Sequence, residues 1–142
     1  MTQTVCPHCE ATNRLPPNKP PLDGKCGRCG QPLYVGEPKA VTGAGLAKRM
    51  AAEPALLVDV WAPWCGPCRA MAPNFAAAAA RLEPDVRLVK LDSEAEPAAA
   101  QRFNVTSIPT LLLIKDGKVA ARTAGLMSTE QIVGWARQGL RL

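Results

Sequence analysis

All six cysteines of this chain stand in Cys-x-x-Cys pairs, and this grouping limits the possible folds more than any other feature of the sequence. The pairs are Cys6/Cys9, Cys26/Cys29 and Cys65/Cys68. A disulfide within such a pair closes a very short loop and constrains the unfolded chain little, so a framework of three structural disulfides is not expected. The same spacing is typical of metal ligands and of redox-active dithiols.

The composition excludes several classes of protein. Of the 142 residues, 47% are hydrophobic and 20% are charged, which is the balance of a globular protein. The longest stretch without a charge covers residues 103–114, whereas a membrane-spanning helix needs about 20 apolar residues. The N-terminus lacks the basic and apolar regions of a signal peptide, so we expect a cytoplasmic protein without a membrane partner. Nucleic acid is not an expected partner either, because the net charge of +5 includes no run of more than two basic residues.

Residues 1–38 are expected to form a small domain held by a metal. They contain few large apolar side chains, so they need a cross-link such as a bound metal ion in order to fold. The sixteen residues between Cys9 and Cys26 match the spacing of a four-cysteine zinc ribbon, with Cys6, Cys9, Cys26 and Cys29 as ligands. We expect Gly27 and Gly30 to supply unusual backbone angles beside the second pair, and His8 to face solvent.

Two alternatives remain open for the first four cysteines. Iron binds the same set of four thiolates, so the ligands alone do not select zinc. Cys6 and Cys9 could instead form a redox pair, but such a pair needs a helix behind it, and the residues that follow Cys9 show no helical pattern.

Residues 39–142 show strands alternating with helices. Strands are predicted at residues 39–41, 56–62, 86–91, 110–114 and 118–123, with a hairpin turn at Asp116-Gly117. Helices are predicted at residues 42–52, 66–82 and 94–103, and a last helix begins at the capping box formed by Ser128 and Gln131. This order predicts an α/β domain, in which a mixed sheet carries helices on both faces.

The third cysteine pair lies at the junction between the strand at 56–62 and the helix at 66–82. Free N–H groups at the start of a helix favour an anion, so Cys65 is the expected thiolate nucleophile. Cys68 stands three residues later on the same helix face and is the expected resolving thiol. A second metal site is the competing interpretation, but no further ligands remain unassigned nearby. Asp59, inside the apolar strand, is expected to have a raised pKa unless it lies at the surface.

The sequence Trp64-Cys65-Gly66-Pro67-Cys68 resembles the active-site motif of the thioredoxin family. Ile108-Pro109-Thr110 and Lys115-Asp116-Gly117 resemble further family motifs, so the similarity covers almost all of residues 39–142. Together with the four-cysteine head, the chain is similar to the bacterial zinc-containing thioredoxin 2 branch. The resemblance implies a thioredoxin fold preceded by a zinc ribbon.

The resemblance also implies roles for individual residues. Asp59 matches the proton acceptor for the resolving cysteine, and Lys90 matches the lysine that pairs with it, unless Lys90 is an ordinary outward-facing strand residue. Ile108 and Pro109 match a loop with a cis proline, whose main chain binds substrate. Gly125 matches a glycine of the substrate groove, although a simple turn glycine is the alternative. The other positions expected to contact substrate, around the cysteine pair, are Trp64, Gly66 and Pro67.

The implied function is reduction of protein disulfides. Electrons would come from NADPH through thioredoxin reductase, and the chain would act as a monomer without an organic cofactor. A disulfide oxidase or isomerase is the first alternative, although it usually carries a signal peptide and a different dipeptide between the cysteines. A zinc-ribbon binding module with a redox-sensing role is the second.

Overall fold

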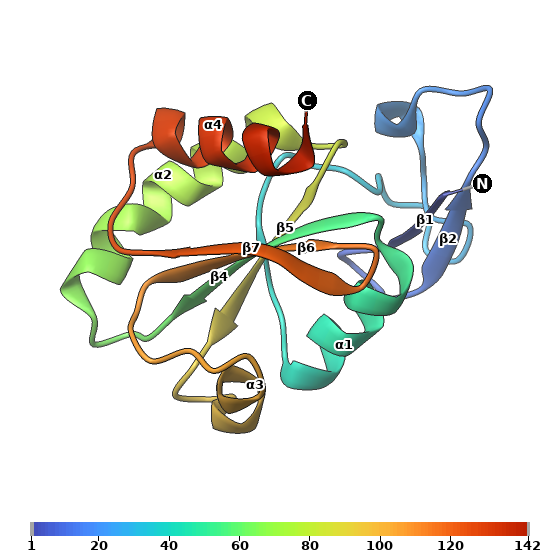
Figure 1. Ribbon diagram of the computed structural model, residues 1–142. Helices are drawn as coiled ribbons and strands as arrows, with labels where there is room; N and C mark the ends of the chain where they lie inside the picture. The colour runs from blue at the N-terminus through green and yellow to red at the C-terminus, as the bar shows by residue number, and fades with distance from the viewer. Residues whose placement is uncertain (1, 142) are drawn as a thin grey trace.

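The computed structural model describes residues 2–141. A five-stranded mixed sheet carries helices on both faces, and a small hairpin domain lies at one end of the sheet (Figure 1). The predicted α/β class is therefore confirmed. None of the helices in this described range is long and apolar enough to span a bilayer.

The sheet places its most apolar strand at the centre. Its order is β3-β5-β4-β6-β7, in which β5 is parallel to β4, and β6 is antiparallel to it. The strands are β3 (Lys39–Ala40), β4 (Ala55–Trp61), β5 (Arg87–Asp92), β6 (Thr110–Lys115) and β7 (Lys118–Ala124). Because both faces of β4 are covered, its sequence is apolar at every position except Asp59, rather than alternating.

Two layers of helices enclose the sheet (Figure 1). Helices α2 (Gly66–Leu82) and α4 (Thr129–Leu140) pack on one face, and α1 (Gly43–Ala52) and α3 (Pro97–Arg102) cover the other. The capping box that opens α4 is present, since the side chains and backbone amides of Ser128 and Gln131 bond reciprocally.

Alternation along β4 divides the core in two. Leu57 packs against Phe75 of α2 and Ile132 of α4, whereas Val58 packs with Leu46 of α1. Successive side chains of a strand point to opposite faces. Asp59 therefore shares the face of Leu57 and lies on the side of the sheet that α2 covers.

Helix α3 is shorter than expected. The sequence predicts a helix over residues 94–103, but α3 begins at Pro97. The carboxylate of Asp92 accepts hydrogen bonds from the backbone N–H groups of Glu94 and Ala95, which holds these residues in a turn. The residue before a proline also avoids the helical region, so the helix cannot include Glu96.

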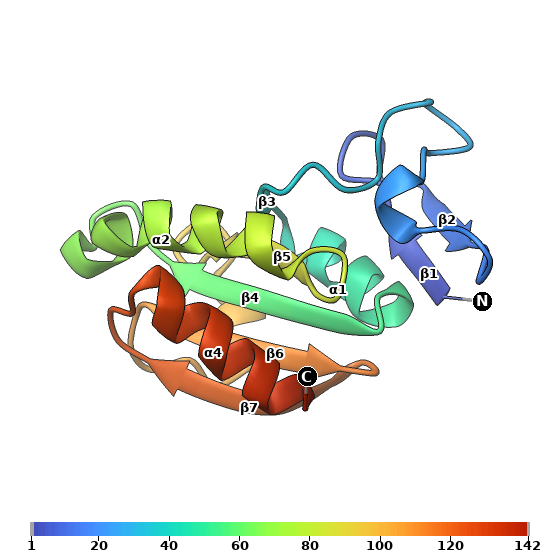
Figure 2. The ribbon, with the colours of Figure 1, turned by 90° about the horizontal axis from the view of Figure 1, so that it is seen from above.

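The N-terminal domain is built on a hairpin that the sequence does not predict. Strands β1 (Thr2–Val5) and β2 (Thr12–Leu15) pair antiparallel, and a 3₁₀ turn follows at Pro21–Asp23. Leu15 and Leu33 provide most of its small apolar core, together with the cysteines. Figure 2 shows this domain beside the start of β4, at the opposite end of the sheet from the start of α2.

Candidate functional site

Cys65 and Cys68 lie where β4 leads into α2. Cys65 is the N-cap of α2, and its sulfur accepts a hydrogen bond from the backbone N–H of Cys68 at 3.2 Å. The two residues form a disulfide. After reduction, the free N–H groups and the dipole at the helix start favour a thiolate on Cys65. This position agrees with the one expected from the sequence.

Exposure distinguishes the two sulfurs. The Cys65 residue is 5% exposed and Cys68 is 1% exposed, so an incoming sulfur can approach Cys65 more easily. Gly66 and Pro67 between them are exposed, and Pro67 stands in the first helical turn, where its missing N–H removes no helix bond. Trp64 is 67% exposed and forms an apolar rim before the dithiol.

A second loop meets the dithiol from the start of β6. The Ile108–Pro109 peptide bond is cis, and the carbonyl oxygen of Ile108 lies 3.9 Å from the sulfur of Cys65. The N–H of Gly125 donates to the carbonyl of Pro109 at 2.9 Å. Gly125 has a φ of +106°, which favours glycine, so it is a turn glycine placed directly beside this loop.

Asp59 is fully buried under α2. Neither carboxylate oxygen has a hydrogen-bond partner among the described residues. Burial raises the pKa of Asp59 to about 7, and the positive charge of Lys90 opposes this rise. The alternative of a surface carboxylate at the strand end is therefore wrong, and the side chain is able to exchange a proton near neutral pH.

Lys90 lies opposite Asp59 but makes no direct ion pair with it in the described structure. The two residues are register partners in the parallel β4–β5 pair, so their side chains share one face of the sheet. The Lys90 ammonium stands 4.6 Å from the centre of the Trp61 ring, where the aromatic face attracts it. Lys90 is half-buried, so it is not an ordinary outward-facing strand lysine.

The raised pKa of Asp59 makes folding stability depend on pH. The pKa rises from 3.8 to about 7 on folding, so the native state binds more protons between these values, and stability falls as pH rises through this window. Asp59→Asn should therefore stabilise the protein more at pH 8 than at pH 4, with a difference of up to about 4 kcal/mol. Urea unfolding at both pH values measures this difference.

The matched control is Asp116→Asn in the exposed β6–β7 turn. An exposed carboxylate without an ion pair should give nearly the same change at both pH values. Equal effects of the two substitutions at pH 8 would contradict the account of Asp59.

The four remaining cysteines converge from two similar knuckles. Within the described residues, their sulfur atoms all lie within 4.8 Å of one another. In the first knuckle the N–H of His8 donates to the sulfur of Cys6, and in the second the N–H groups of Arg28 and Cys29 donate to Cys26. The N–H of Cys29, followed by the Asn13 amide, lowers the pKa of the Cys26 thiol to about 6.

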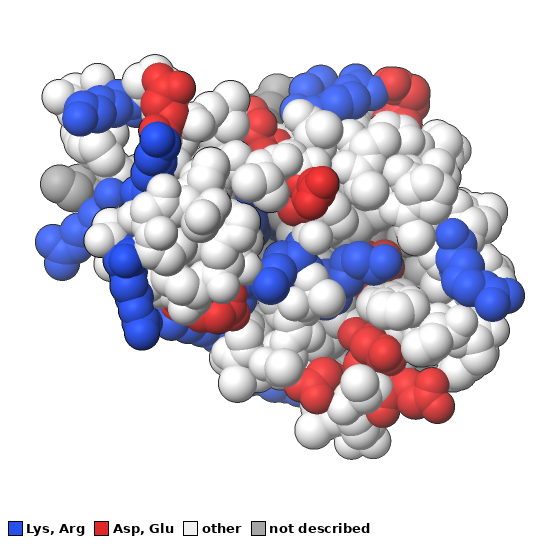
Figure 3. All heavy atoms as spheres, turned by 180° about the vertical axis from the view of Figure 1, so that it is seen from behind, with Lys and Arg blue, Asp and Glu red and all other residues white. Residues whose placement is uncertain are grey.

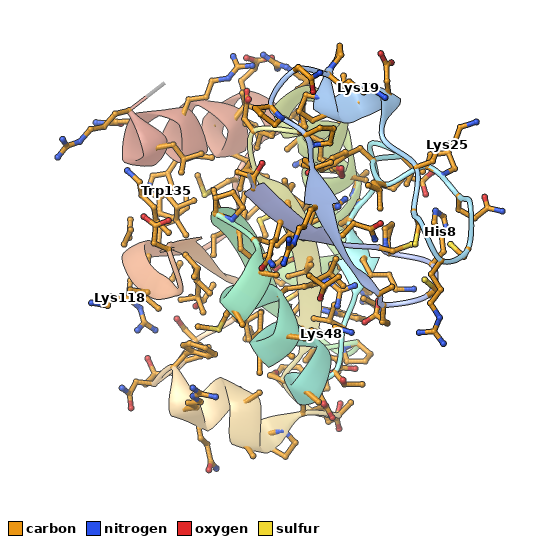
Figure 4. All side chains as sticks on the ribbon, turned by 90° about the vertical axis from the view of Figure 1, so that its right-hand side faces the viewer. His8, Lys19, Lys25, Lys48, Lys118 and Trp135 are labelled. Carbon is orange, nitrogen blue, oxygen red and sulfur yellow. A yellow bond between two sulfur atoms is a disulfide. The ribbon has the colours of Figure 1, made fainter. Side chains whose placement is uncertain are left out.

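One expectation about the knuckles is wrong. Gly30 has a φ of +78°, as the sequence suggests, but Gly27 does not have a positive φ. Glu10 occupies the position in the first knuckle that corresponds to Gly30, and its φ is +67°. His8 is exposed, as expected, and its ring Nε2 lies 3.1 Å from the carbonyl oxygen of Pro32 (Figure 4).

The sulfur geometry fits a single tetrahedral ion. Four thiolates about 2.3 Å from a zinc ion would lie about 3.8 Å apart. The sulfurs of Cys6 and Cys29 are 3.6 Å apart, and those of Cys9 and Cys26 are also 3.6 Å apart. A closed set of four thiolates leaves no position for water or substrate, which is the arrangement of structural rather than catalytic metal sites.

Loss of the metal should unfold the ribbon. Cys26→Ser removes one ligand, and the small apolar core of residues 2–35 cannot replace the binding energy of the ion, about 10 kcal/mol or more. We expect amide NMR signals of the ribbon to collapse while those of the sheet persist. Ribbon signals that stay dispersed after the metal has been lost would contradict a structural role.

A buried ionic cluster joins the ribbon to the sheet, and sequence reasoning missed it. We call this group, made of Thr4, Tyr34, Glu53, Glu83 and Arg87, the interdomain cluster. Arg87 at the start of β5 is 3% exposed and donates to Glu83 at 3.1 Å, to Glu53 at 3.4 Å and to the Thr4 hydroxyl at 2.6 Å. Its guanidinium also lies 4.2 Å from the centre of the Tyr34 ring.

The carboxylates of the interdomain cluster are unevenly satisfied. Glu53 accepts hydrogen bonds from the Thr4 hydroxyl and from the Val5 N–H. One oxygen of Glu83 has no partner among the described residues, and burial raises the pKa of Glu83 to about 7.

A second contact between the ribbon and the sheet domain joins Arg49 of α1 to Glu10 through two hydrogen bonds of 2.6 and 2.7 Å. The sequence signals for these contacts are limited to the arginines, since Arg49 lies inside a predicted helix and Arg87 inside a predicted strand.

Two family models match this chain. Thioredoxin matches residues 38–138, and the N-terminal domain of thioredoxin 2 matches residues 5–31. Thioredoxin C-3 of Corynebacterium nephridii is 38% identical over 96% of this chain and 94% of its own length. The thioredoxin of Chlamydia muridarum is 49% identical over 55% of this chain and 76% of its own length.

Solved structures agree with these sequence relatives. A mutant thioredoxin from Halobacterium salinarum superposes with a TM-score of 0.70 at 27% identity, covering 77% of this chain and 96% of its own. Chloroplastic thioredoxin z gives a TM-score of 0.68 at 28% identity, covering 75% and 96%. A disulfide oxidase or isomerase is not favoured by these relatives. The chain belongs to the thioredoxin family, in its thioredoxin 2 type, and is a protein-disulfide reductase.

Proposed function

We propose that the chain reduces protein disulfides by two-step exchange at Cys65 and Cys68. The Cys65 thiolate attacks one sulfur of the substrate disulfide, forms a mixed disulfide and releases the first substrate thiolate. Cys68 then gives its proton to Asp59, directly or through water, and attacks the sulfur of Cys65. This second step releases the other substrate thiolate and leaves the Cys65–Cys68 disulfide, so two electrons pass to the substrate.

The surfaces around Cys65 support a role in holding the substrate chain. The Ile108–Pro109 main chain would hold an extended substrate segment. Gly125 leaves open space beside it, because a Cβ at this position would meet no atom within 4 Å. Trp64, Gly66 and Pro67 complete the exposed rim. Lys90 acts on Asp59 through its charge and therefore positions the proton transfer without touching substrate.

We also propose an electron donor, an oligomeric state, a compartment, a metal ion and a domain boundary for this chain. Thioredoxin reductase would reduce the Cys65–Cys68 disulfide back to the dithiol with electrons from NADPH. The chain would work as a monomer in the cytoplasm. A reducing compartment is supported by the four cysteines of the ribbon, which are arranged as metal ligands rather than as disulfides. Zinc is the proposed ion at Cys6, Cys9, Cys26 and Cys29, within a ribbon domain of residues 1–38 followed by a thioredoxin domain of residues 39–142.

The observation that carries the proposal is the position of Cys65, at a helix start and against the Ile108 loop. The test follows NADPH oxidation with bacterial thioredoxin reductase and a protein disulfide as acceptor. We expect continuous turnover that depends on this chain. Absence of turnover with a folded, metal-loaded protein would contradict recycling by this reductase.

A further inference from the structure

A groove opens at the end of the molecule away from the dithiol. Its volume is about 930 Å³, and its walls come from β1, α1, the end of α3 and the β6–β7 turn. Gln3, Met50 and Gly117 are among its lining residues. The β6–β7 turn lies beside the start of β4, whereas Cys65 follows the other end of that strand, so the groove is separate from the substrate rim.

A smaller apolar pocket continues the groove between α1 and α3. Its volume is about 220 Å³, and Leu46 and Phe103 line it. Three residues line both spaces, so the two are contiguous: Ala47, Met50 and Arg102. The pocket has room for one apolar side chain of a segment that lies along the groove.

Within the described residues, the edge of β1 that faces away from β2 is bonded at Val5 and open at Gln3. The N–H of Val5 donates to Glu53, and its carbonyl accepts from Arg87, so the main chain of Val5 faces away from β2. Alternate residues of an antiparallel strand face the same side, so the main chain of Gln3 faces away from β2 as well. Within residues 2–141, nothing bonds to the Gln3 main chain on this side.

The charges around the groove favour an acidic partner. Arg14 and Arg102 line it, and neither takes part in an ion pair in the described structure. Glu53 is already bonded within the interdomain cluster, which leaves Asp116 as the free lining acid. Lysine and arginine side chains also gather over the ribbon end of the face in Figure 3. Figure 4 looks onto this end, with the β1–β2 hairpin beside α1 and with Lys118 and Lys48 on opposite sides of α1 in the view.

We propose that this groove binds an extended acidic segment of a second protein. The segment adds to β1 as a third strand through the main chain of Gln3, places one apolar side chain in the pocket between α1 and α3, and pairs its carboxylates with Arg14 and Arg102. A partner held there leaves Cys65 and its rim open. The inference does not depend on the proposed recycling or on the exchange chemistry.

The test uses the full-length, metal-loaded protein labelled with ¹⁵N. The probe is the capped heptapeptide Asp-Val-Glu-Leu-Glu-Val-Asp, and its control carries lysine at every acidic position. We expect saturable shifts of the amide signals of Gln3, Met50 and Arg102 with the acidic peptide, and much weaker shifts with the lysine peptide.

Two pairs of variants separate main-chain pairing from charge. Gln3→Pro removes the N–H on the open edge and should weaken binding about tenfold, whereas Gln3→Ala keeps the N–H and should stay within about twofold. Arg102→Glu should also weaken binding at least about tenfold, and Lys19→Glu on the outer ribbon loop should have little effect.

Three results would overturn the proposal. The first is the absence of saturable shifts, and the second is a set of shifts confined to Trp64 and Ile108, which would place the peptide at the substrate rim. The third is the same amide shifts appearing without peptide as protein concentration rises, which would assign the groove to a second copy of this chain.

Discussion

Cys65→Ser should lower the rate of protein-disulfide reduction at least about 1,000-fold, because a hydroxyl at this position cannot form the attacking thiolate. The substitution preserves the α2 cap, since serine is also a favoured N-cap residue. Circular dichroism and metal content should therefore remain those of the unchanged protein. The NADPH-coupled assay measures the loss.

The matched control is Cys29→Ser in the ribbon, at the far end of the sheet. This variant should lose its metal but keep reductase turnover within about threefold, because no described contact joins Cys29 to the dithiol. Loss of the metal in Cys65→Ser would contradict the separation of the two sites. Loss of turnover in Cys29→Ser would contradict it as well.

Arg87→Met should reduce the free energy of unfolding by about 3–5 kcal/mol. The substitution keeps the apolar bulk but removes the cation that pairs with Glu53 and Glu83, so two buried carboxylates lose their partner. It also removes the hydrogen bond to the Leu33 carbonyl and the contact with the Tyr34 ring, both of which hold the ribbon. Urea unfolding of the metal-loaded protein measures the loss.

Arg81→Met is the control for this second prediction. Arg81 pairs with Glu130 between α2 and α4, but the two side chains are 40% and 79% exposed. An exposed pair contributes at most about 1 kcal/mol, so this substitution should be mild. Similar losses for Arg81→Met and Arg87→Met would show that burial of the interdomain cluster does not determine its contribution.

The sheet and the dithiol could be predicted because their signals are local. The apolar run of β4, the Asp116-Gly117 turn and the capping box at Ser128 each follow from adjacent residues, and all three are present. The two Cys-x-x-Cys knuckles follow from spacing in the same way. Asp59 could be placed because a lone carboxylate inside an apolar strand has few alternatives to burial.

The rest depends on contacts between distant residues. The interdomain cluster brings Thr4 beside Glu53 and Arg87, which are 49 and 83 residues away. No local sequence pattern predicts contacts between residues so far apart. The β1–β2 hairpin has short strands with weak alternation, so its sequence does not distinguish it from a loop. The predicted start of α3 is wrong because the Asp92 carboxylate competes with the helix for the same backbone N–H groups.

The exchange mechanism is tested most directly by trapping its intermediate. Cys68→Ser lacks the thiol that resolves the mixed disulfide, so the reduced variant should remain covalently attached to a protein-disulfide substrate. Peptide mapping by mass spectrometry, with Cys65→Ser as the variant that should trap nothing, then identifies the attached cysteine. The account predicts a linkage at Cys65. A linkage at any of the four ribbon cysteines, or no trapped substrate at all, would contradict it.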